Sequence, residues 1–155
     1  VWTPTNVFDR PASWATSYNG FMHGLPADFL AVVQPAVLAC RTNSLFEVES
    51  LDGTAFAINQ LYSLKADKFF LLSRPEIFGN WDSESYKDGT QLEYYNGLTA
   101  TERIKRDVAG TARHAWLRSP LPSRASYARI VNSDGTLNGH TAYNGYGVAP
   151  ACIIA

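Results

Sequence analysis

The chain has 155 residues, of which 46% are hydrophobic, and its formal net charge is −1. This length fits one domain with a sizeable core, and the hydrophobic content excludes an intrinsically disordered chain. The charge balance lacks the clustered basic face that binds nucleic acid, and no apolar run approaches the roughly 20 residues of a membrane span. We therefore expect neither nucleic-acid binding nor membrane insertion. Because the chain opens on Val1 rather than Met, we expect a fragment of a longer protein.

The first third of the chain predicts loops, one helix and a hairpin. Residues 1–24 show no periodicity and predict loops packed by their aromatic side chains. A helix is expected from Leu25, with Pro26 in its first turn, and Pro35 is expected to end it. Its apolar face would consist of Leu25, Phe29, Val32 and Val33, and Asp28 would lie near its positive end.

Extended segments and two short helices are expected next. Residues 36–41 and 45–49 look extended, and an Asp52-Gly53 turn into residues 54–58 predicts a hairpin. Residues 68–72 form a short apolar strand candidate. Each helix is predicted by a capping box, in which a Ser or Thr cap is followed three residues later by Glu. The two boxes are Ser73-Arg74-Pro75-Glu76 and Thr99-Ala100-Thr101-Glu102.

An acidic loop is predicted over residues 79–97. Its carboxylates are Asp82, Glu84, Asp88 and Glu93. A solvated loop is the favoured interpretation, because the spacing does not match the twelve-residue calcium loop. A glycosidase pair is the enzymatic alternative, which requires two carboxyl groups at a set separation.

The C-terminal third predicts an antiparallel sheet. In residues 127–132, Tyr127, Arg129 and Val131 alternate with Ala128, Ile130 and Asn132, so the two sets point to opposite faces. The turn at 133–136 contains Asp134-Gly135 and leads into a return strand over 136–142. Residues 146–154 predict a buried closing strand, and Pro150 implies an edge or a bulge. Because no long helix follows a strand, the predicted class is α+β with short helices, a small antiparallel sheet and much irregular loop.

The sequence contains no motif that indicates enzyme chemistry or a cofactor. There is no phosphate-binding glycine loop and no Gly-x-Ser-x-Gly elbow, and His23, His114 and His140 lack metal-ligand spacing with the cysteines. The two cysteines, Cys40 and Cys152, lie in apolar runs, so free thiols are favoured over a disulfide.

Residues 121–146 have a distinctive composition. They are rich in Tyr, Ser, Gly and Asn, as in antigen-binding loops, where Tyr supplies rigid contact area and the small polar residues adapt. Lys, Glu, Gln, Met and Trp occur elsewhere in the chain but not once in this segment. Those five types cannot arise when an Asn codon is randomised at its adenines, whereas the types present can. An ordinary polar loop with a hairpin is the alternative.

Three motifs in the last forty residues resemble a known family: residues 116–120 (WLRSP), 132–135 (NSDG) and 146–151 (YGVAPA). They are similar to phage, prophage and gut-bacterial domains with a C-type-lectin-like, formylglycine-generating-enzyme-like fold. Some members resemble variable proteins of diversity-generating retroelements. The resemblance implies one C-type-lectin-like domain over residues 1–155, in which 121–146 is the variable ligand-binding segment.

The resemblance also implies roles. Trp116, Leu117, Arg118 and residues 147–151 would be scaffold. The ligand-facing residues would be Ser123, Arg124, Ser126, Tyr127, Arg129, Asn132, Asn138, His140, Tyr143, Asn144 and Tyr146. We expect Tyr127, Arg129, His140, Tyr143 and Tyr146 to share one exposed face, with Trp116 buried.

The implied function is a ligand- or receptor-binding domain on a virion or bacterial cell surface, whose partner is a host-surface protein or glycan. A structural virion protein is the alternative, and a homo-oligomer is left open. Calcium-dependent lectins carry Glu-Pro-Asn or Gln-Pro-Asp, but here Ala36 follows Gln34-Pro35. Formylglycine-generating enzymes use a close cysteine pair, which Cys152 lacks. Neither calcium-mediated sugar binding nor oxidase activity is expected.

Overall fold

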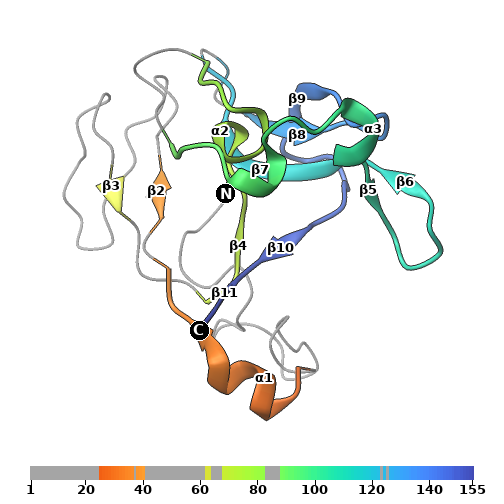
Figure 1. Cartoon of the computed structure of the whole chain (residues 1–155). Coiled ribbons are helices and arrows are strands. Elements are labelled where there is room, and N and C mark those ends of the chain that lie inside the picture. Colours follow the sequence, from red (N-terminus) through yellow and green to blue (C-terminus); the bar gives the residue numbers. More distant parts are fainter. Residues whose placement is uncertain are drawn as a thin grey trace. The chain divides into compact units, whose positions relative to one another are not determined.

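The computed structural model describes residues 25–36, 38–40, 62–63, 68–82, 88–122, 124 and 126–155 (Figure 1). The predictions for residues 1–24, 45–49 and 52–58, and for Glu84 and Ser123, lie outside the described residues. The chain divides into two compact units. The first comprises Val1–Leu38, Ser63–Phe70 and Pro150–Ala155, and the second comprises Ala39–Tyr62 and Leu71–Ala149. The expectation of one domain over residues 1–155 stays a prediction.

In the first unit, the predicted helix is present as α1 (Ala27–Val32), but it begins two residues later than expected, with Pro26 as its N-cap rather than in its first turn. The helix ends before Val33, which is extended and 1% exposed in strand β1 (Val33–Gln34). Placing Val33 on a helical face was therefore wrong. The reason is Pro35, which disfavours a helical conformation at Gln34 and so ends the helix early. Inside the unit, the Lys68 ammonium group donates to the Leu30 carbonyl at 2.9 Å.

The C-terminal strands of the first unit are short and lie at its surface. Strand β11 (Ile153–Ile154) pairs antiparallel with β1, and β10 (Pro150–Ala151) pairs with β4 (Phe70–Leu71). Ile153 and Ile154 are 47% and 62% exposed, so the expectation of a buried closing strand was wrong. In a two-residue strand that pairs on one side only, little of each side chain is covered. Cys152 is a free thiol, as favoured, but it is half-buried rather than buried.

The second unit contains a three-stranded antiparallel sheet in the order β7-β8-β9 (Figure 1). Its strands are β7 (Ala115–Pro120), β8 (Tyr127–Val131) and β9 (Leu137–Thr141). Tyr127 pairs with Thr141 and Val131 with Leu137, which confirms the predicted hairpin and its alternation. The register of β7 against β8 shifts between Trp116 and Pro120, as at a β-bulge. Strands β2 (Ala39–Cys40) and β3 (Tyr62–Ser63) form a separate two-stranded sheet.

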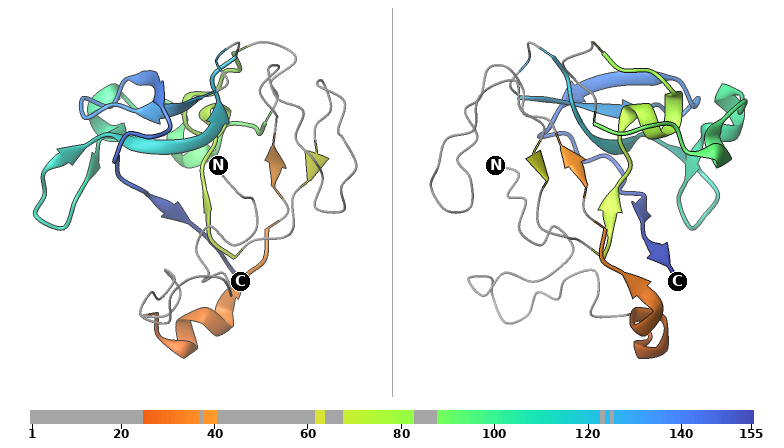
Figure 2. Two further views of the ribbon diagram at one scale, coloured as in Figure 1. Left: turned by 180° about the vertical axis from the view of Figure 1, so that it is seen from behind. Right: turned by 60° about the vertical axis from the view of Figure 1, so that its left-hand side comes forward.

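One face of the three-stranded sheet covers a hydrophobic core. Leu117 and Val131 pack with Ile77 of helix α2 (Arg74–Phe78) and with Tyr95 of the 3-10 helix Glu93–Tyr95. All four are at most 7% exposed. Leu72, Phe78, Leu98 and Leu137 pack partly buried around them. This core fixes the orientation of the sheet relative to α2, which Figure 2 shows from two further directions.

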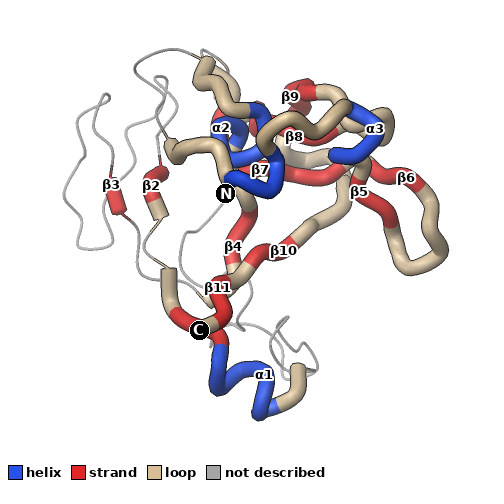
Figure 3. The backbone as a smooth tube through the Cα atoms, in the orientation of Figure 1, coloured by secondary structure: helices blue, strands red, loops and turns tan. Residues whose placement is uncertain are grey.

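Both predicted capping boxes are present. At the start of α2, the Ser73 N–H donates to Glu76 Oε2 at 2.8 Å, and the Glu76 N–H donates to Ser73 Oγ at 3.4 Å. At the start of α3 (Ala100–Arg103), Glu102 Oε2 accepts from the Thr99 N–H at 2.8 Å and from Thr99 Oγ1 at 2.7 Å. Helices and strands are short and separated by long loops (Figure 3), so the α+β class is confirmed. No helix in the described part of the chain combines the length and the apolar character of a membrane span.

Two hairpins of the second unit share one turn design. In the β8–β9 turn, the Gly135 N–H donates to the Asn132 carbonyl at 2.9 Å and the Asn132 N–H to the Thr136 carbonyl at 2.8 Å. In the hairpin of β5 (Lys105–Arg106) and β6 (Ala112–Arg113), Gly110 donates in the same way to Asp107 at 2.9 Å. The glycines have φ of 82° and 80°, which is typical of a type I turn with a glycine bulge.

The two turn glycines differ in what surrounds them, which gives a matched test. A Cβ on Gly135 would lie 1.7 Å from the Ala100 carbonyl oxygen, whereas a Cβ on Gly110 would meet nothing within 4 Å. Gly110→Ala should lower the free energy of unfolding by about 1–2 kcal/mol, the cost of a left-handed alanine, and Gly135→Ala by at least about 3 kcal/mol. Urea denaturation of both variants measures the difference. Equal losses would contradict a close approach of the turn to α3.

Candidate binding surface

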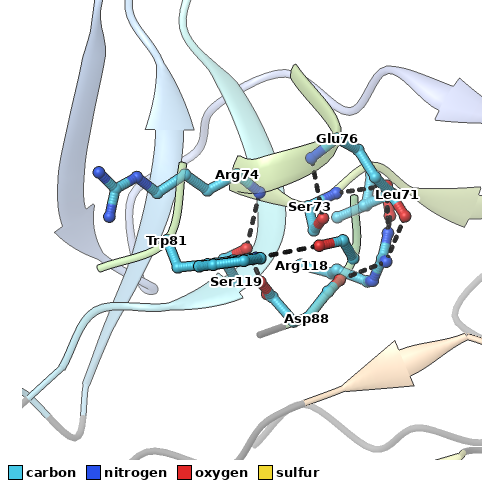
Figure 4. A network of polar contacts seen from close by, with 9 residues as sticks. Leu71, Ser73, Arg74, Glu76, Trp81, Asp88, Arg118 and Ser119 are labelled. Atoms are coloured by element: carbon cyan, nitrogen blue, oxygen red, sulfur yellow. Dashed lines mark hydrogen bonds and ion pairs between the residues drawn. The ribbon is translucent and has the colours of Figure 1, made fainter. Parts of the chain in front are cut away.

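A buried polar network supports strand β7 (Figure 4). The Arg118 guanidinium group donates to both carboxylate oxygens of Glu76, at 2.6 and 2.5 Å. It also donates to the backbone carbonyls of Leu71 at 2.9 Å and Asp88 at 2.8 Å. The Arg118 side chain is 3% exposed and that of Glu76 13%. Because two-point contact fixes both position and orientation, Arg118 locks β7 to the start of α2 and to the segment at Asp88.

Ser119 extends the network from the next position of β7. Its hydroxyl accepts from the Arg74 N–H at 2.7 Å and donates to Asp88 Oδ2 at 2.5 Å (Figure 4). Asp88 is 3% exposed, and its burial raises the pKa of its carboxyl group above the ordinary value. The expectation of a solvated acidic loop was therefore wrong at Asp88. It was also wrong at Asp82, which pairs with Arg74 and Arg129 and has an 11% exposed side chain.

The sheet face opposite the core carries aromatic side chains. Trp116 pairs with Ile130, and Ala128 with His140, so these residues point away from the Leu117 and Val131 face. Gly147 forms a parallel bridge to Ala115 at the free edge of β7. The Trp116 N–H donates to the Gly147 carbonyl at 3.0 Å, and the Gly147 N–H to the His114 carbonyl at 2.9 Å. This edge pairing brings Tyr146 beside the outer face.

Tyr146 is the centre of an aromatic cluster, defined here as His114, Trp116, His140 and Tyr146. Its ring centroid lies 4.9 Å from that of His114, 5.1 Å from Trp116 and 5.4 Å from His140. Since β8 separates β7 from β9, a ring that meets side chains of both strands must lie over β8. Ile130, on the same outer face of β8, is fully buried. All four cluster residues are themselves half-exposed.

The imidazole of His114 is held in one orientation. Its Nδ1 accepts a hydrogen bond from the Ser133 N–H at 3.2 Å, so the neutral ring carries its proton on Nε2. The β8–β9 turn thus positions a side chain of the cluster. Composition gave no sign of this contact, because His114 precedes the segment 121–146.

The predicted ligand-facing residues do not share one face. His140 and Tyr146 lie in the aromatic cluster, whereas Tyr127 and Arg129 point to the opposite side of β8. The expected common face was therefore wrong, and Trp116 is half-exposed rather than buried. The alternation along β8 was predicted, but the register that places His140 opposite Ala128 depends on pairing. Arg124 places its guanidinium carbon 5.1 Å from the Tyr127 ring centroid, on the Tyr127 side.

The other predicted residues divide between turn-stabilising and exposed positions. Asn132 Nδ2 donates to Thr136 Oγ1 at 3.0 Å, and Asn144 Nδ2 donates to the Thr141 carbonyl at 3.0 Å. Tyr143 is 85% exposed. Ser126 and Asn138 are also exposed; the Ser126 carbonyl accepts from the Ala142 N–H at 2.8 Å, and Asn138 Oδ1 accepts from the Gly139 N–H at 2.8 Å.

Comparison with known proteins gives one match. The model of a family described as Domain of unknown function (DUF6273) matches residues 19–155. No curated protein and no solved structure matches the chain.

Removing Arg118 tests the support network. Arg118→Met should lower the free energy of unfolding by about 3–5 kcal/mol, because it leaves the largely buried Glu76 carboxylate without its counter-charge. Arg113→Met is the matched control: Arg113 pairs with Asp107 at 2.8 Å, but its side chain is 61% exposed, so the loss should be at most about 1 kcal/mol. Chemical denaturation measures both. Comparable losses would contradict a supporting role for Arg118.

The raised pKa of Asp88 predicts a pH-dependent difference between wild type and Asp88→Asn. In the unfolded chain Asp88 ionises near 3.8, whereas burial delays ionisation in the folded protein to a higher pH. The contribution of Asp88 to the free energy of unfolding of the wild type therefore decreases as pH rises from 3.8 through the raised pKa. The free energy of unfolding of Asp88→Asn relative to wild type should increase over that window. A difference that stays constant from pH 3 to pH 7 would contradict the burial effect.

Proposed function

The chain belongs to the DUF6273 family, and we propose that it is a ligand- or receptor-binding display domain whose contact surface consists of residues 121–146 and the aromatic cluster. In this proposal the scaffold has a C-type-lectin-like fold of phage or prophage origin, as the resemblance of its C-terminal motifs implies. The domain is displayed on a virion or bacterial cell surface. Its partner is a host-surface protein or glycan, bound without a cofactor and without catalysis.

The observation that carries the proposal is the aromatic cluster on the sheet face opposite the core. An antiparallel sheet with one face on a core commonly presents polar side chains on its other face. Here that face presents Trp116, Tyr146 and two imidazoles, all half-exposed. Aromatic and imidazole rings combine apolar contact area with hydrogen-bonding groups, a chemistry enriched at binding surfaces.

The distribution of structural contacts also supports the proposal. The buried network involves Glu76, Asp88, Arg118 and Ser119, none of which lies in residues 121–146. Within that segment, Arg124, Ser126, Asn138 and Tyr143 are exposed. A surface whose side chains have few internal contacts tolerates substitution while the scaffold stays folded. Such tolerance is what a diversified binding segment requires.

Exposed tyrosines provide a matched test of the contact surface. After a partner is found by screening the domain against bacterial surface proteins and glycans, Tyr143→Ala should weaken its binding at least about tenfold, since exposed tyrosines are common binding hot spots. Tyr94→Ala is the control, because Tyr94 is 74% exposed but lies in the 3-10 helix Glu93–Tyr95. Thermal unfolding checks that both variants remain folded.

Two outcomes would contradict the proposal. One is wild-type affinity in both Tyr143→Ala and His140→Ala. The other is a symmetric oligomer that covers residues 121–146 and the aromatic cluster, which would favour a structural virion protein. Diversification is tested separately in the coding DNA, where a nearly identical template repeat beside a reverse transcriptase gene is expected.

A further inference from the structure

Two arginine side chains share one carboxylate on the other side of the sheet. Arg129 of β8 donates to Asp82 from Nε at 2.9 Å and from Nη2, and Arg74 of α2 forms an ion pair with the same Asp82 oxygen through Nη1. The side chains of Arg74, Arg129 and Asp82 are 12%, 17% and 11% exposed. The group therefore carries one excess positive charge in a mostly buried place. In Figure 4 the guanidinium group of Arg74 points away from Arg118 and Glu76, so it does not belong to the network around Arg118.

The hydrogen-bond donors of this arginine pair are not all used. Arg74 Nη2 donates to Asn80 Oδ1 at 3.3 Å. Arg74 Nε is buried and has no hydrogen-bond acceptor within the described part of the chain, whereas Nη1 is engaged in the ion pair with Asp82. A buried donor without an acceptor costs about 1–3 kcal/mol. Burial lowers the pKa of Arg74 and repulsion from Arg129 lowers it further, while the carboxylates of Asp82 and Asp88 act in the opposite direction.

The neighbouring carboxylates are already engaged. Glu76 binds Arg118 at both oxygens. Asp88 accepts from Ser119 and attracts Arg74 through its charge, but in the described part of the chain it forms no ion pair with the Arg74 guanidinium group. Asp82 is shared between both arginines. One more oxyanion would balance the charge of the group formed by the two arginines and Asp82, and it would supply an acceptor for the unused Arg74 Nε–H. A planar guanidinium group presents its donors in a fork that matches a carboxylate, phosphate or sulfate group.

We propose that Arg74 and Arg129 form a binding site for an oxyanion, namely the carboxylate, phosphate or sulfate group of a ligand. Asp82 positions the two guanidinium groups and at the same time competes with the incoming anion. The site is separate from the aromatic cluster, because Arg129 points to the side of β8 opposite His140. It predicts recognition of an acidic ligand whether or not the aromatic cluster binds a partner.

The test uses sodium sulfate and sodium phosphate as probes, with sodium chloride at matched ionic strength as reference. Thermal unfolding should shift upward with saturation as either oxyanion is added, because a ligand that binds only the folded state stabilises it. Arg129→Gln should abolish the saturable shift, since Arg74 and Asp82 then form a balanced pair. Asp82→Asn should lower the half-saturating concentration by about tenfold, because removing the competing charge strengthens anion binding. Arg113→Gln is the charge-matched control and should titrate as wild type does, because the Arg113 side chain is 61% exposed and lies outside residues 121–146.

The opposite directions of the two variants distinguish a site from general salt effects, which stabilise all variants alike. An Arg129→Gln protein that titrates like wild type would overturn the proposal. If Asp82→Asn fails to fold, the side-chain Nε–H signals of wild-type Arg74 and Arg129 decide by NMR. Saturable chemical-shift changes at both signals support the site, and unchanged signals at saturating sulfate refute it.

Discussion

The second unit depends on the burial of one charged side chain. Arg118 is 3% exposed, yet its guanidinium group reaches Glu76 and the carbonyls of Leu71 and Asp88. A buried cation is stable only when its charge and its donors are matched, so these segments must meet at the same place. The capping box contributes to this requirement, because the Glu76 Oε2 that accepts from Ser73 also accepts from Arg118. Helix initiation and sheet attachment therefore use one carboxylate.

The attachment of β7 determines what each face of the sheet can do. With Leu117 and Val131 directed at α2, alternation turns Trp116 and Ile130 outward. Ile130 is fully buried on that outer face, and the pairing of Gly147 at the edge of β7 brings the Tyr146 ring beside Trp116, which pairs with Ile130. The same constraint directs Arg129 to the side of Asp82. The aromatic cluster and the charged group of Arg129 and Asp82 thus lie on opposite sides of β8.

Local signals in the sequence predicted local structure well. The capping boxes at Ser73 and Thr99 and the Asp134-Gly135 turn were predicted correctly, because their hydrogen bonds join residues at most four apart. The α+β class followed from the same signals. The roles of Asp82 and Asp88 could not be predicted, since Asp82 meets Arg129 across 47 residues and Asp88 meets Ser119 across 31. Carboxylates in a loop without periodicity look solvated until the partners that bury them are known.

The candidate site likewise combines features that the sequence predicted with features that it could not predict. The composition of residues 121–146 identified His140 and Tyr146, but it could not assign them a side of the sheet, because that depends on strand register. It also omitted His114 and Trp116, which lie before the segment and complete the cluster. Side chains of β7 and β9 that point to the same face of the sheet form one surface. The cluster can therefore be found only when the alternation of side chains along both strands is considered together.

Not every position in residues 121–146 is equally free to vary. Gly135 approaches Ala100 too closely for a side chain, and Asn132 and Asn144 stabilise turns. Ile130 and Val131 are buried on opposite faces of β8. Variation compatible with this fold is therefore confined to exposed positions such as Tyr143, Asn138 and Arg124. Within residues 121–146, the turn and the buried positions maintain the fold, and the exposed positions between them are available as a contact surface. The unusual composition of the segment is thus compatible with its structural constraints.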